Sequence, residues 1–269
     1  MPELAEVEFY RKQWNPGLGR KILAVELHGQ ARVLRDTDAR LLSKSLSKAT
    51  LLRSETHGKR MLFRFSNDGW LGLHLGMTGQ LRVEPKGFAP ARHDHLILRT
   101  ARLCLVFSDP RQFGRIQFHA GRGEPSWWCD RPPGLLSRQF TLERMRDFLR
   151  RHGKAPIKAV LLNQDGFPGL GNWMVDEVLW RARLAPPTRA GRIKAPAVNR
   201  LYRAIQWVSR EALRIIGKDF SDPPRSWLLL HRWKKGNHCP RCGAALRFSE
   251  VGGRTTCYCQ DCQGATSTG

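Results

Sequence analysis

The sequence predicts a multidomain α+β fold, and three observations support that prediction. Short strand-like runs separated by turn residues fill the segment 20–120. Helical patterns replace them beyond residue 134, and the last forty residues contain two Cys-x2-Cys pairs. A chain of 269 residues is long enough for about two domains of roughly 150 residues, each with a core of its own.

A short helix is expected at the N-terminus, because Leu4, Val7 and Trp14 recur at helical spacing and acidic residues stand in its first turn. Beyond it, short apolar stretches alternate with turn signals such as Asn-Asp-Gly, which is typical of strands. These stretches lie at 60–66, 70–75, 96–100, 103–107 and 115–118. Strands at this spacing favour a β-sandwich or a barrel.

Glycine and proline are concentrated in GRGEPSWWCDRPPG at 121–134, which indicates a linker. Helices are expected after it, at 141–151, 156–162, 172–183 and 197–216. Thr141 is a suitable N-cap for the first of them. The last is the most regular, because its apolar residues from Val198 to Ile215 recur at steps of three and four.

Four C-terminal cysteines predict a structural metal site. They are Cys239, Cys242, Cys259 and Cys262. Two such pairs complete a tetrahedron, and an all-thiolate set favours one Zn²⁺. Gly252-Gly253 between the pairs predicts a β-hairpin. Because a closed four-thiolate site has no open position, the zinc would stabilise the fold and perform no chemistry. Cys257 is an alternate ligand or a spectator, and we favour a spectator because Cys259 preserves the two-residue spacing.

The charge indicates a polyanionic partner. Lysine and arginine number 46 against 23 acidic residues, a formal net charge of +23, and a polyphosphate backbone is the commonest partner for such an excess. Seven cysteines exclude a complete disulfide set and indicate a reducing compartment. No apolar run approaches the ~20 residues of a membrane span, and no secretory signal follows Met1. We therefore expect a cytoplasmic protein with no membrane partner.

The N-terminus offers a nucleophile. Removal of Met1, which is normal before a small second residue, would expose the secondary amine of Pro2. Such an amine is less basic than a lysine side chain and can attack an electrophilic carbon at neutral pH.

The run PELAEVE at 2–8 resembles the opening of the formamidopyrimidine-DNA glycosylase/endonuclease VIII family of bacterial base-excision repair enzymes. Further stretches agree in the family's order and cover nearly the whole chain. They are HGK at 57–59, HLGMTG at 74–79, DPRQFG at 109–114, GLGN at 169–172 and the cysteine hairpin with Arg254.

The resemblance implies a β-sandwich with a leading helix, then a helical domain with a helix–two-turns–helix element, then a β-hairpin zinc finger. The corresponding ranges are 1–122, a linker at 123–134, 135–228 and 229–269. It also implies a monomeric, bifunctional DNA glycosylase and AP lyase. Such an enzyme excises oxidised or ring-opened bases from damaged double-stranded DNA through a proline Schiff base and cleaves the strand by β,δ-elimination.

The resemblance also assigns the catalytic residues. Pro2 corresponds to the nucleophile and Glu3 to its acid/base partner, while Lys59 corresponds to a lysine that aids the lyase steps. Arg254 corresponds to a phosphate clamp on the hairpin, and Glu6 to a supporting residue that orients the site.

The remaining motif residues correspond to DNA contacts. Met77, Arg111 and Phe113 would fill the gap left by a flipped nucleotide. The thioether of Met77 and the ring of Phe113 would restore stacking, and Arg111 would hydrogen-bond the orphaned base. Asn172 and Lys158 would hold phosphates. His93 and Lys154 match further basic positions.

The chain also departs from the family's pattern. Ala5 replaces a second proline and Gln112 a common basic residue. Between Ile216 and Cys239 the chain is compact and contains Pro223-Pro224, whereas members that excise 8-oxoguanine well carry a long glycine-rich loop there. We therefore hypothesise that 8-oxoguanine is a poorer substrate than ring-opened purines, oxidised pyrimidines or abasic sites.

Three alternatives remain open. The first is an endonuclease VIII-like specialist for oxidised pyrimidines. The second is a non-catalytic module that recognises DNA damage, although Pro2, Glu3 and Lys59 together argue against it. The third, a generic zinc-ribbon DNA-binding protein, leaves residues 2–3 unexplained.

Overall fold

The computed structural model describes residues 1–28, 31–234 and 236–264. The chain divides into two compact units at Arg131 and Pro132. The sandwich unit comprises residues 6–131 together with the first two residues. The helical unit comprises residues 3–5 and the chain from Pro132 onwards, including the cysteine hairpin. The division falls inside the segment whose composition indicates a linker.

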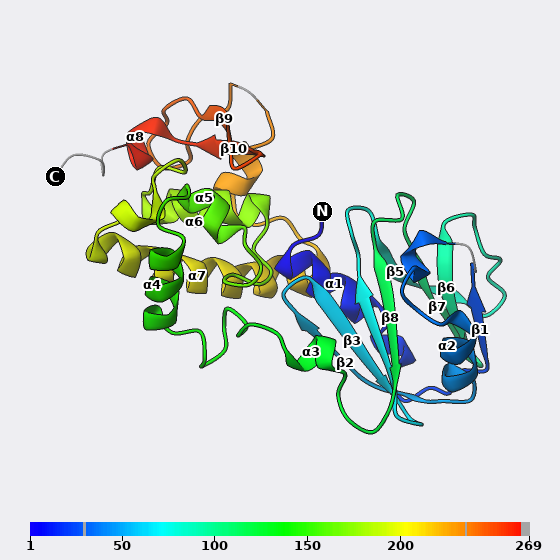
Figure 1. Ribbon diagram of the computed structural model, residues 1–269. Coiled ribbons are helices and arrows are strands. Elements are labelled where there is room, and N and C mark those ends of the chain that lie inside the picture. The colour runs from blue at the N-terminus through cyan, green and yellow to red at the C-terminus, as the bar shows by residue number, and fades with distance from the viewer. Residues whose placement is uncertain (29–30, 235, 265–269) are drawn as a thin grey trace. The chain divides into compact units, whose positions relative to one another are not determined.

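The sandwich unit contains two four-stranded antiparallel sheets, which confirms a β-sandwich (Figure 1). Their strand orders are β1-β6-β7-β5 and β2-β3-β4-β8. The strands are β1 Ala24–Leu27, β2 Leu51–His57, β3 Arg60–Phe65, β4 Gly69–His74, β5 Gln80–Pro85, β6 Asp94–Arg99, β7 Leu103–Ser108 and β8 Arg115–Ala120. Five of them match the strands expected from the sequence, and β1, β2 and β5 are additional.

Successive side chains along a strand point to opposite faces of the sheet, so every second one enters the sandwich core. On β3, Met61, Phe63 and Phe65 are buried in the core that also takes Trp14, because side chains two residues apart share a face. The same core receives apolar residues of α1 (Leu4–Gln13) and α2 (Ala39–Leu46). Short 3-10 helices occur at η1 Asn15–Gly17 and η2 Arg32–Leu34.

Part of the glycine- and proline-rich segment packs onto the sandwich. Helix α3 (Ser126–Cys129) buries Trp128 against Leu62 and Trp70 on the outer face of the second sheet. The ring of Trp127 occupies the space that a side chain at Gly72 would need. This part of the segment is therefore a folded cover of the sheet.

The helical unit confirms the four expected helices. They are α4 Leu142–Arg151, α5 Ile157–Leu161, α6 Asn172–Ala182 and α7 Ala195–Asp219, with 3-10 helices η3 Ala190–Arg192 and η4 Leu228–His231. The Thr141 hydroxyl accepts a hydrogen bond from the Arg144 N–H at 3.2 Å, as an N-cap should. Helix α6 is buried on nearly all sides. Among the described residues, no helix is both long and apolar enough to cross a membrane.

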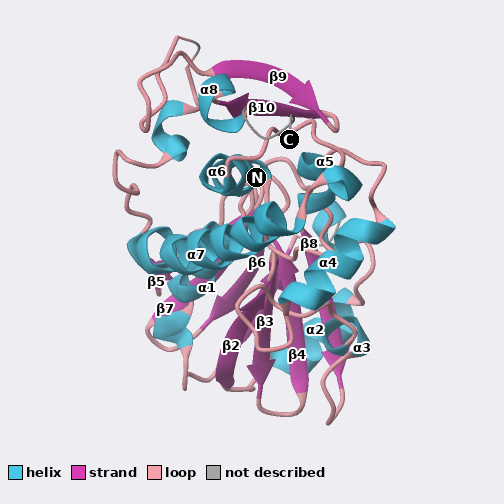
Figure 2. Ribbon diagram, turned by 90° about the vertical axis from the view of Figure 1, so that its left-hand side faces the viewer, coloured by secondary structure: helices cyan, strands magenta, loops and turns pink. Residues whose placement is uncertain are grey.

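The cysteine segment forms the expected hairpin of β9 (Arg247–Val251) and β10 (Arg254–Tyr258), followed by α8 (Gln260–Gln263). Gly252 and Gly253 have φ angles of 62° and 70°, and such turns require glycine-like backbone at both positions. Figure 2 shows the hairpin lying beside α6, against which β10 packs.

Candidate active site and nucleic-acid interface

Glu3 is bound to the N-terminus of α6. Its Oε1 accepts the Trp173 N–H and its Oε2 accepts the Met174 N–H, each at 3.0 Å. The carboxylate is only 4% exposed. A side chain on Gly171 would overlap it, so glycine is required in the GLGN turn. The positive end of the helix dipole stabilises a negative charge there, and the chain places the partly exposed Pro2 directly before this fixed carboxylate.

In the sandwich unit, Asp109 joins two loops. Its Oδ1 accepts the Thr78 hydroxyl at 2.6 Å and its Oδ2 accepts the Gly114 N–H at 2.7 Å. The side chain is fully buried, and a buried carboxylate is stable only when it is hydrogen-bonded in this way. The loops 75–79 and 109–114 are therefore held as one structure. The carbonyl of His93 accepts the Asp109 N–H at 3.0 Å, which brings His93 beside them.

These two loops expose the three residues expected to enter DNA. Met77 and Phe113 are 41% and 43% exposed, and Arg111 lies with its guanidinium carbon 4.7 Å from the Phe113 ring centroid. Gly76 has a φ of 60°, and a side chain there would overlap the backbone of Phe113. Glycine thus allows the loops to approach closely. Exposed apolar side chains on such fixed loops suit insertion between bases.

Lys59 lies in the turn between β2 and β3, next to Gly58, whose φ is 58°. It is close enough to His74 to affect that imidazole. Burial is the largest cause that lowers the pKa of His74, and together with the positive charges of Arg60 and Lys59 it brings the value to about 4. The neutral ring accepts the Gly76 N–H through Nδ1 at 3.1 Å. His74 therefore helps to fix the loop that carries Met77.

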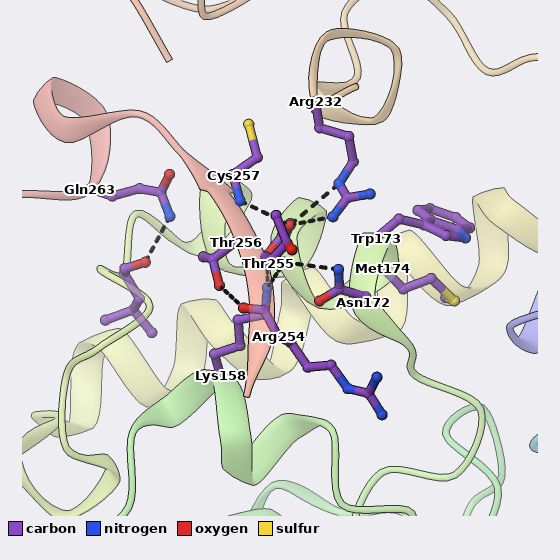
Figure 3. A network of polar contacts seen from close by, with 12 residues as sticks. Lys158, Asn172, Trp173, Met174, Arg232, Arg254, Thr255, Thr256, Cys257 and Gln263 are labelled. Carbon is purple, nitrogen blue, oxygen red and sulfur yellow. Dashed lines mark hydrogen bonds and ion pairs between the residues drawn. The ribbon is translucent and has the colours of Figure 1, made fainter. Parts of the chain in front are cut away.

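On the cysteine hairpin, Arg254 is exposed as the first residue of β10. The carbonyl of the next residue, Thr255, accepts the Asn172 Nδ2 and the Lys158 Nζ, each at 2.9 Å. Asn172 begins α6 as expected. Figure 3 shows Arg254 and Asn172 on either side of this carbonyl, close to Trp173 and Met174. The N–H groups of Trp173 and Met174 are the ones that the Glu3 carboxylate accepts, so Arg254, Asn172 and Glu3 belong to one connected part of the helical unit.

Lys158 requires a correction, because the structure does not present it to a phosphate. Its side chain is fully buried, and its Nζ donates to Asp176 Oδ1 at 2.7 Å. Burial lowers the pKa of Lys158, and Asp176 opposes that effect. An ammonium that is already paired inside the protein has no donor directed at solvent, so we assign it a structural role. Lys154, in contrast, is exposed just before α5.

Glu6 occupies the first turn of α1 and is partly exposed. Burial raises the pKa of the neighbouring Tyr10, and the negative charge of Glu6 raises it further. A supporting role for Glu6 stays a prediction.

The four predicted cysteine ligands come together. Their sulfur atoms all lie within 4.8 Å of one another, and three pairs are separated by 3.5, 3.5 and 3.9 Å. Tetrahedral thiolates at about 2.3 Å from zinc are separated by roughly 3.8 Å, so this set fits the metal.

Cys257 lies outside this group of sulfur atoms. This supports its interpretation as a spectator.

Three residues that order the site were not singled out from the sequence. Asp109 and His74 stand inside motifs quoted for their neighbours, and Asp176 follows Asn172 by one helical turn. The available signal was polarity: each is a titratable residue within or beside a run that is otherwise buried.

The fold and the site are typical of a DNA-binding enzyme: a fixed carboxylate lies near the N-terminus, apolar side chains are exposed on two joined loops, and four clustered cysteines flank a β-hairpin. Residues 1–116 match the family model for the formamidopyrimidine-DNA glycosylase N-terminal domain, and residues 132–222 match that for its H2TH domain.

Relatives in sequence and solved structures agree with these family-model matches. The formamidopyrimidine-DNA glycosylase of Pelotomaculum thermopropionicum is 34% identical, over 98% of this chain and 99% of its own length. That of Alkalilimnicola ehrlichii is 35% identical, over 98% of this chain and all of its own. The Lactococcus lactis Fpg protein, solved with DNA containing an oxidised pyrimidine, is 29% identical with a TM-score of 0.89, covering 97% and 99% of the two chains. The chain belongs to the formamidopyrimidine-DNA glycosylase/endonuclease VIII family of base-excision repair glycosylases.

Proposed function

We propose that the chain is a monomeric, bifunctional DNA glycosylase and AP lyase that excises oxidised or ring-opened bases from duplex DNA. The observation that carries the proposal is the Glu3 carboxylate, held by two N–H groups of α6 directly after Pro2. A nucleophile with an adjacent, oriented proton-transfer group is the arrangement that covalent catalysis needs. The Lactococcus lactis protein has been solved with oxidised-pyrimidine and abasic-site DNA, which supports the substrate class.

The proposed reaction begins when the Pro2 nitrogen attacks C1′ of the damaged nucleotide. The base leaves with the bonding electron pair, and the sugar ring opens to give an iminium. Glu3 transfers the protons that these steps require. Because the iminium withdraws electrons, the C2′ proton becomes acidic. Its removal expels the 3′ phosphate by β-elimination, and δ-elimination then expels the 5′ phosphate. Lys59 aids the lyase steps.

DNA contacts follow from the exposed side chains. Flipping a nucleotide costs a few kcal/mol of stacking and pairing. Met77 and Phe113 recover part of that cost by occupying the gap, and Arg111 bonds the orphaned base. Arg254 and Asn172 hold phosphates beside the lesion, while His93 and Lys154 extend the basic surface. The net charge of +23 supplies the general attraction to DNA.

We propose Zn²⁺ as the metal of Cys239, Cys242, Cys259 and Cys262. Zinc bound there would pin the two knuckles of the hairpin and so hold Arg254 in place. With all four positions taken by sulfur, the ion would have no contact with the substrate.

The lesion preference follows from the segment after α7. Trp227 is 2% exposed, and its ring lies 6.5 Å from that of Trp173 and 5.3 Å from that of Trp207. Leu228 is also fully buried. This anchoring supports our hypothesis that the segment does not act as a mobile lid and that 8-oxoguanine is a poorer substrate. Rapid single-turnover release of 8-oxoguanine, relative to ring-opened purines in matched duplexes, would contradict it.

A direct test of the proposed function is single-turnover excision by the zinc-loaded chain with Glu3→Gln. We expect base release to fall on the order of 10²-fold or more. Glu8→Gln is the control, because Glu8 is a partly buried carboxylate on α1 that bonds Arg11 and Thr56. Equal losses in the two variants, or no loss in either, would remove Glu3 from the chemistry. A non-catalytic damage-recognition module would bind the duplex and release no base.

A further inference from the structure

One edge of strand β10 is held by side chains of the helical unit. The strand pairs with β9 along its other edge. On the free edge, the Thr255 carbonyl accepts Lys158 Nζ and Asn172 Nδ2, and the Cys257 N–H donates to Asp176 Oδ2 at 3.2 Å. Backbone groups two residues apart share an edge. The side chains of Lys158, Asn172 and Asp176 thus make the backbone hydrogen bonds that a neighbouring strand would otherwise make.

Asp176 is the centre of this arrangement. It is fully buried on α6. Its Oδ1 accepts Lys158 Nζ at 2.7 Å, and its Oδ2 accepts the Arg232 guanidinium at 2.8 Å. Figure 3 shows the side chains of Lys158 and Arg232 approaching each other from opposite sides. One carboxylate therefore joins α5, α6, the residue after η4 and β10. Interactions of buried charges are strong because water does not screen them.

Arg254 stands at the end of the held strand. It directly precedes Thr255 and is exposed. Within the described residues, its guanidinium makes no hydrogen bond or ion pair, and Figure 3 shows it pointing away from the buried cluster. Its backbone position is thus determined by the cluster, while its charged group is left for a ligand.

We propose that Asp176 is a positioning residue for Arg254. By holding β10 against the first turns of α6, it sets the place of the Arg254 guanidinium relative to the Glu3 carboxylate at the same helix N-terminus. A phosphate bound by Arg254 is then held at a fixed distance from the group that transfers protons. This inference rests on the proposed function, since it takes Arg254 as a phosphate contact.

Glu177 provides a matched control for Asp176. The two carboxylates are consecutive on α6 and fully buried. Each accepts one arginine and one backbone N–H: Arg232 and Cys257 for Asp176, Arg181 and Leu229 for Glu177. Asp176 accepts Lys158 Nζ as well. Only Asp176 contacts β10. Loss of either charge leaves an arginine without its carboxylate, but only the loss of the Asp176 charge also removes the partner of Lys158 and the bond to β10.

The experiment measures kcat and KM for cleavage of an abasic-site duplex by zinc-loaded Asp176→Asn, Glu177→Gln, Arg254→Ala and the double variant Asp176→Asn/Arg254→Ala. Zinc content and Tm are recorded for each. We expect Asp176→Asn to lower kcat/KM roughly 10- to 100-fold with one zinc retained, and Glu177→Gln to stay within about twofold. In the Arg254→Ala background, Asp176→Asn should cost less than about twofold more.

Additive losses from Asp176→Asn and Arg254→Ala, or an equal loss from Glu177→Gln, would overturn the inference. If Arg254→Ala alone has no effect, the proposed phosphate contact fails irrespective of Asp176. Should Asp176→Asn not fold, Arg232→Lys serves instead, because it keeps the charge and removes the paired N–H groups. The same coupling to Arg254 is then expected, and its absence would count against the proposal.

Discussion

The Thr78 hydroxyl donates a 2.6 Å hydrogen bond to the buried Asp109 carboxylate. This bond ties the loop that carries Met77 to the loop that carries Arg111 and Phe113. Side chains that insert into DNA bind more tightly when their loops are already ordered, because a mobile loop would lose conformational entropy on entering the duplex. The Thr78–Asp109 pair supplies that fixation.

Thr78→Val should therefore weaken both stability and damage recognition. It leaves one oxygen of a buried carboxylate without a donor, which costs about 1–3 kcal/mol, measurable by urea unfolding. Affinity for an abasic-site duplex should fall as well. Thr37→Val is the control, because the Thr37 hydroxyl likewise donates a 2.6 Å hydrogen bond within the sandwich unit, here to the Ile116 carbonyl. A similar loss of DNA affinity in the control would show that loop fixation is not the cause.

Phe113→Ala should separate function from stability. The side chain is 43% exposed, so the free energy of unfolding should change by less than about 0.5 kcal/mol. Loss of one stacking contact should raise the activation free energy of excision by about 1–3 kcal/mol, which lowers the excision rate roughly 5- to 150-fold. Leu52→Ala, at a 49% exposed position on β2, should leave excision unchanged. Unchanged excision by Phe113→Ala would remove this residue from the interface.

His74 should make stability depend on pH. Its pKa in the fold is about 4, below the ordinary value of 6.5, chiefly through burial. The unfolded chain therefore binds a proton in the window between these values while the folded chain does not. The contribution of His74 is present above pH 6.5 and is lost as the pH falls toward 4. At about 1.4 kcal/mol per pKa unit, the contribution of His74 to the free energy of unfolding is at most about 3 kcal/mol.

His74→Asn tests this pH dependence, because an amide oxygen can still accept the Gly76 N–H. Urea unfolding of the wild-type chain and the variant at several pH values from 4 to 7 isolates the contribution of His74. We expect the wild-type chain to lose more stability on acidification than the variant. Parallel curves would show that His74 does not titrate in this range.

Zinc binding should follow the predicted ligands. We expect one zinc per chain by elemental analysis, retained in Cys257→Ser and lost in Cys259→Ser. Because the metal would join the two Cys-x2-Cys segments that flank the hairpin, its loss should unfold this segment and abolish tight DNA binding. Zinc loss from Cys257→Ser would instead show that the buried thiol is a ligand.

Much of the fold was predictable because its signals are local. The helices from Leu142 to Asp219 have clear periodicity, and the cysteine spacing with Gly252-Gly253 specifies the hairpin. Strands β1, β2 and β5 were missed since their exposed faces are polar and β1 spans only Ala24–Leu27. Helix α3 was missed because its proline-rich surroundings indicate a linker, and only the packing of Trp128 gives it a fixed place.

The site was predictable only as far as the motifs reach. They indicate Glu3, Met77 and Phe113 as candidate site residues, but not the groups that hold these residues. Lys158 shows the limit, because a lysine before a glycine-rich turn gives no indication that Asp176 lies 2.7 Å away. Such pairing depends on tertiary contacts between residues far apart in sequence.

The most direct test of the account is borohydride reduction of the chain on an abasic-site duplex, followed by peptide mapping of the cross-link. The account predicts a mature chain that begins at Pro2, with DNA attached to the Pro2 nitrogen. A cross-link at a lysine such as Lys59, or complete strand cleavage by a chain that still carries Met1, would contradict it.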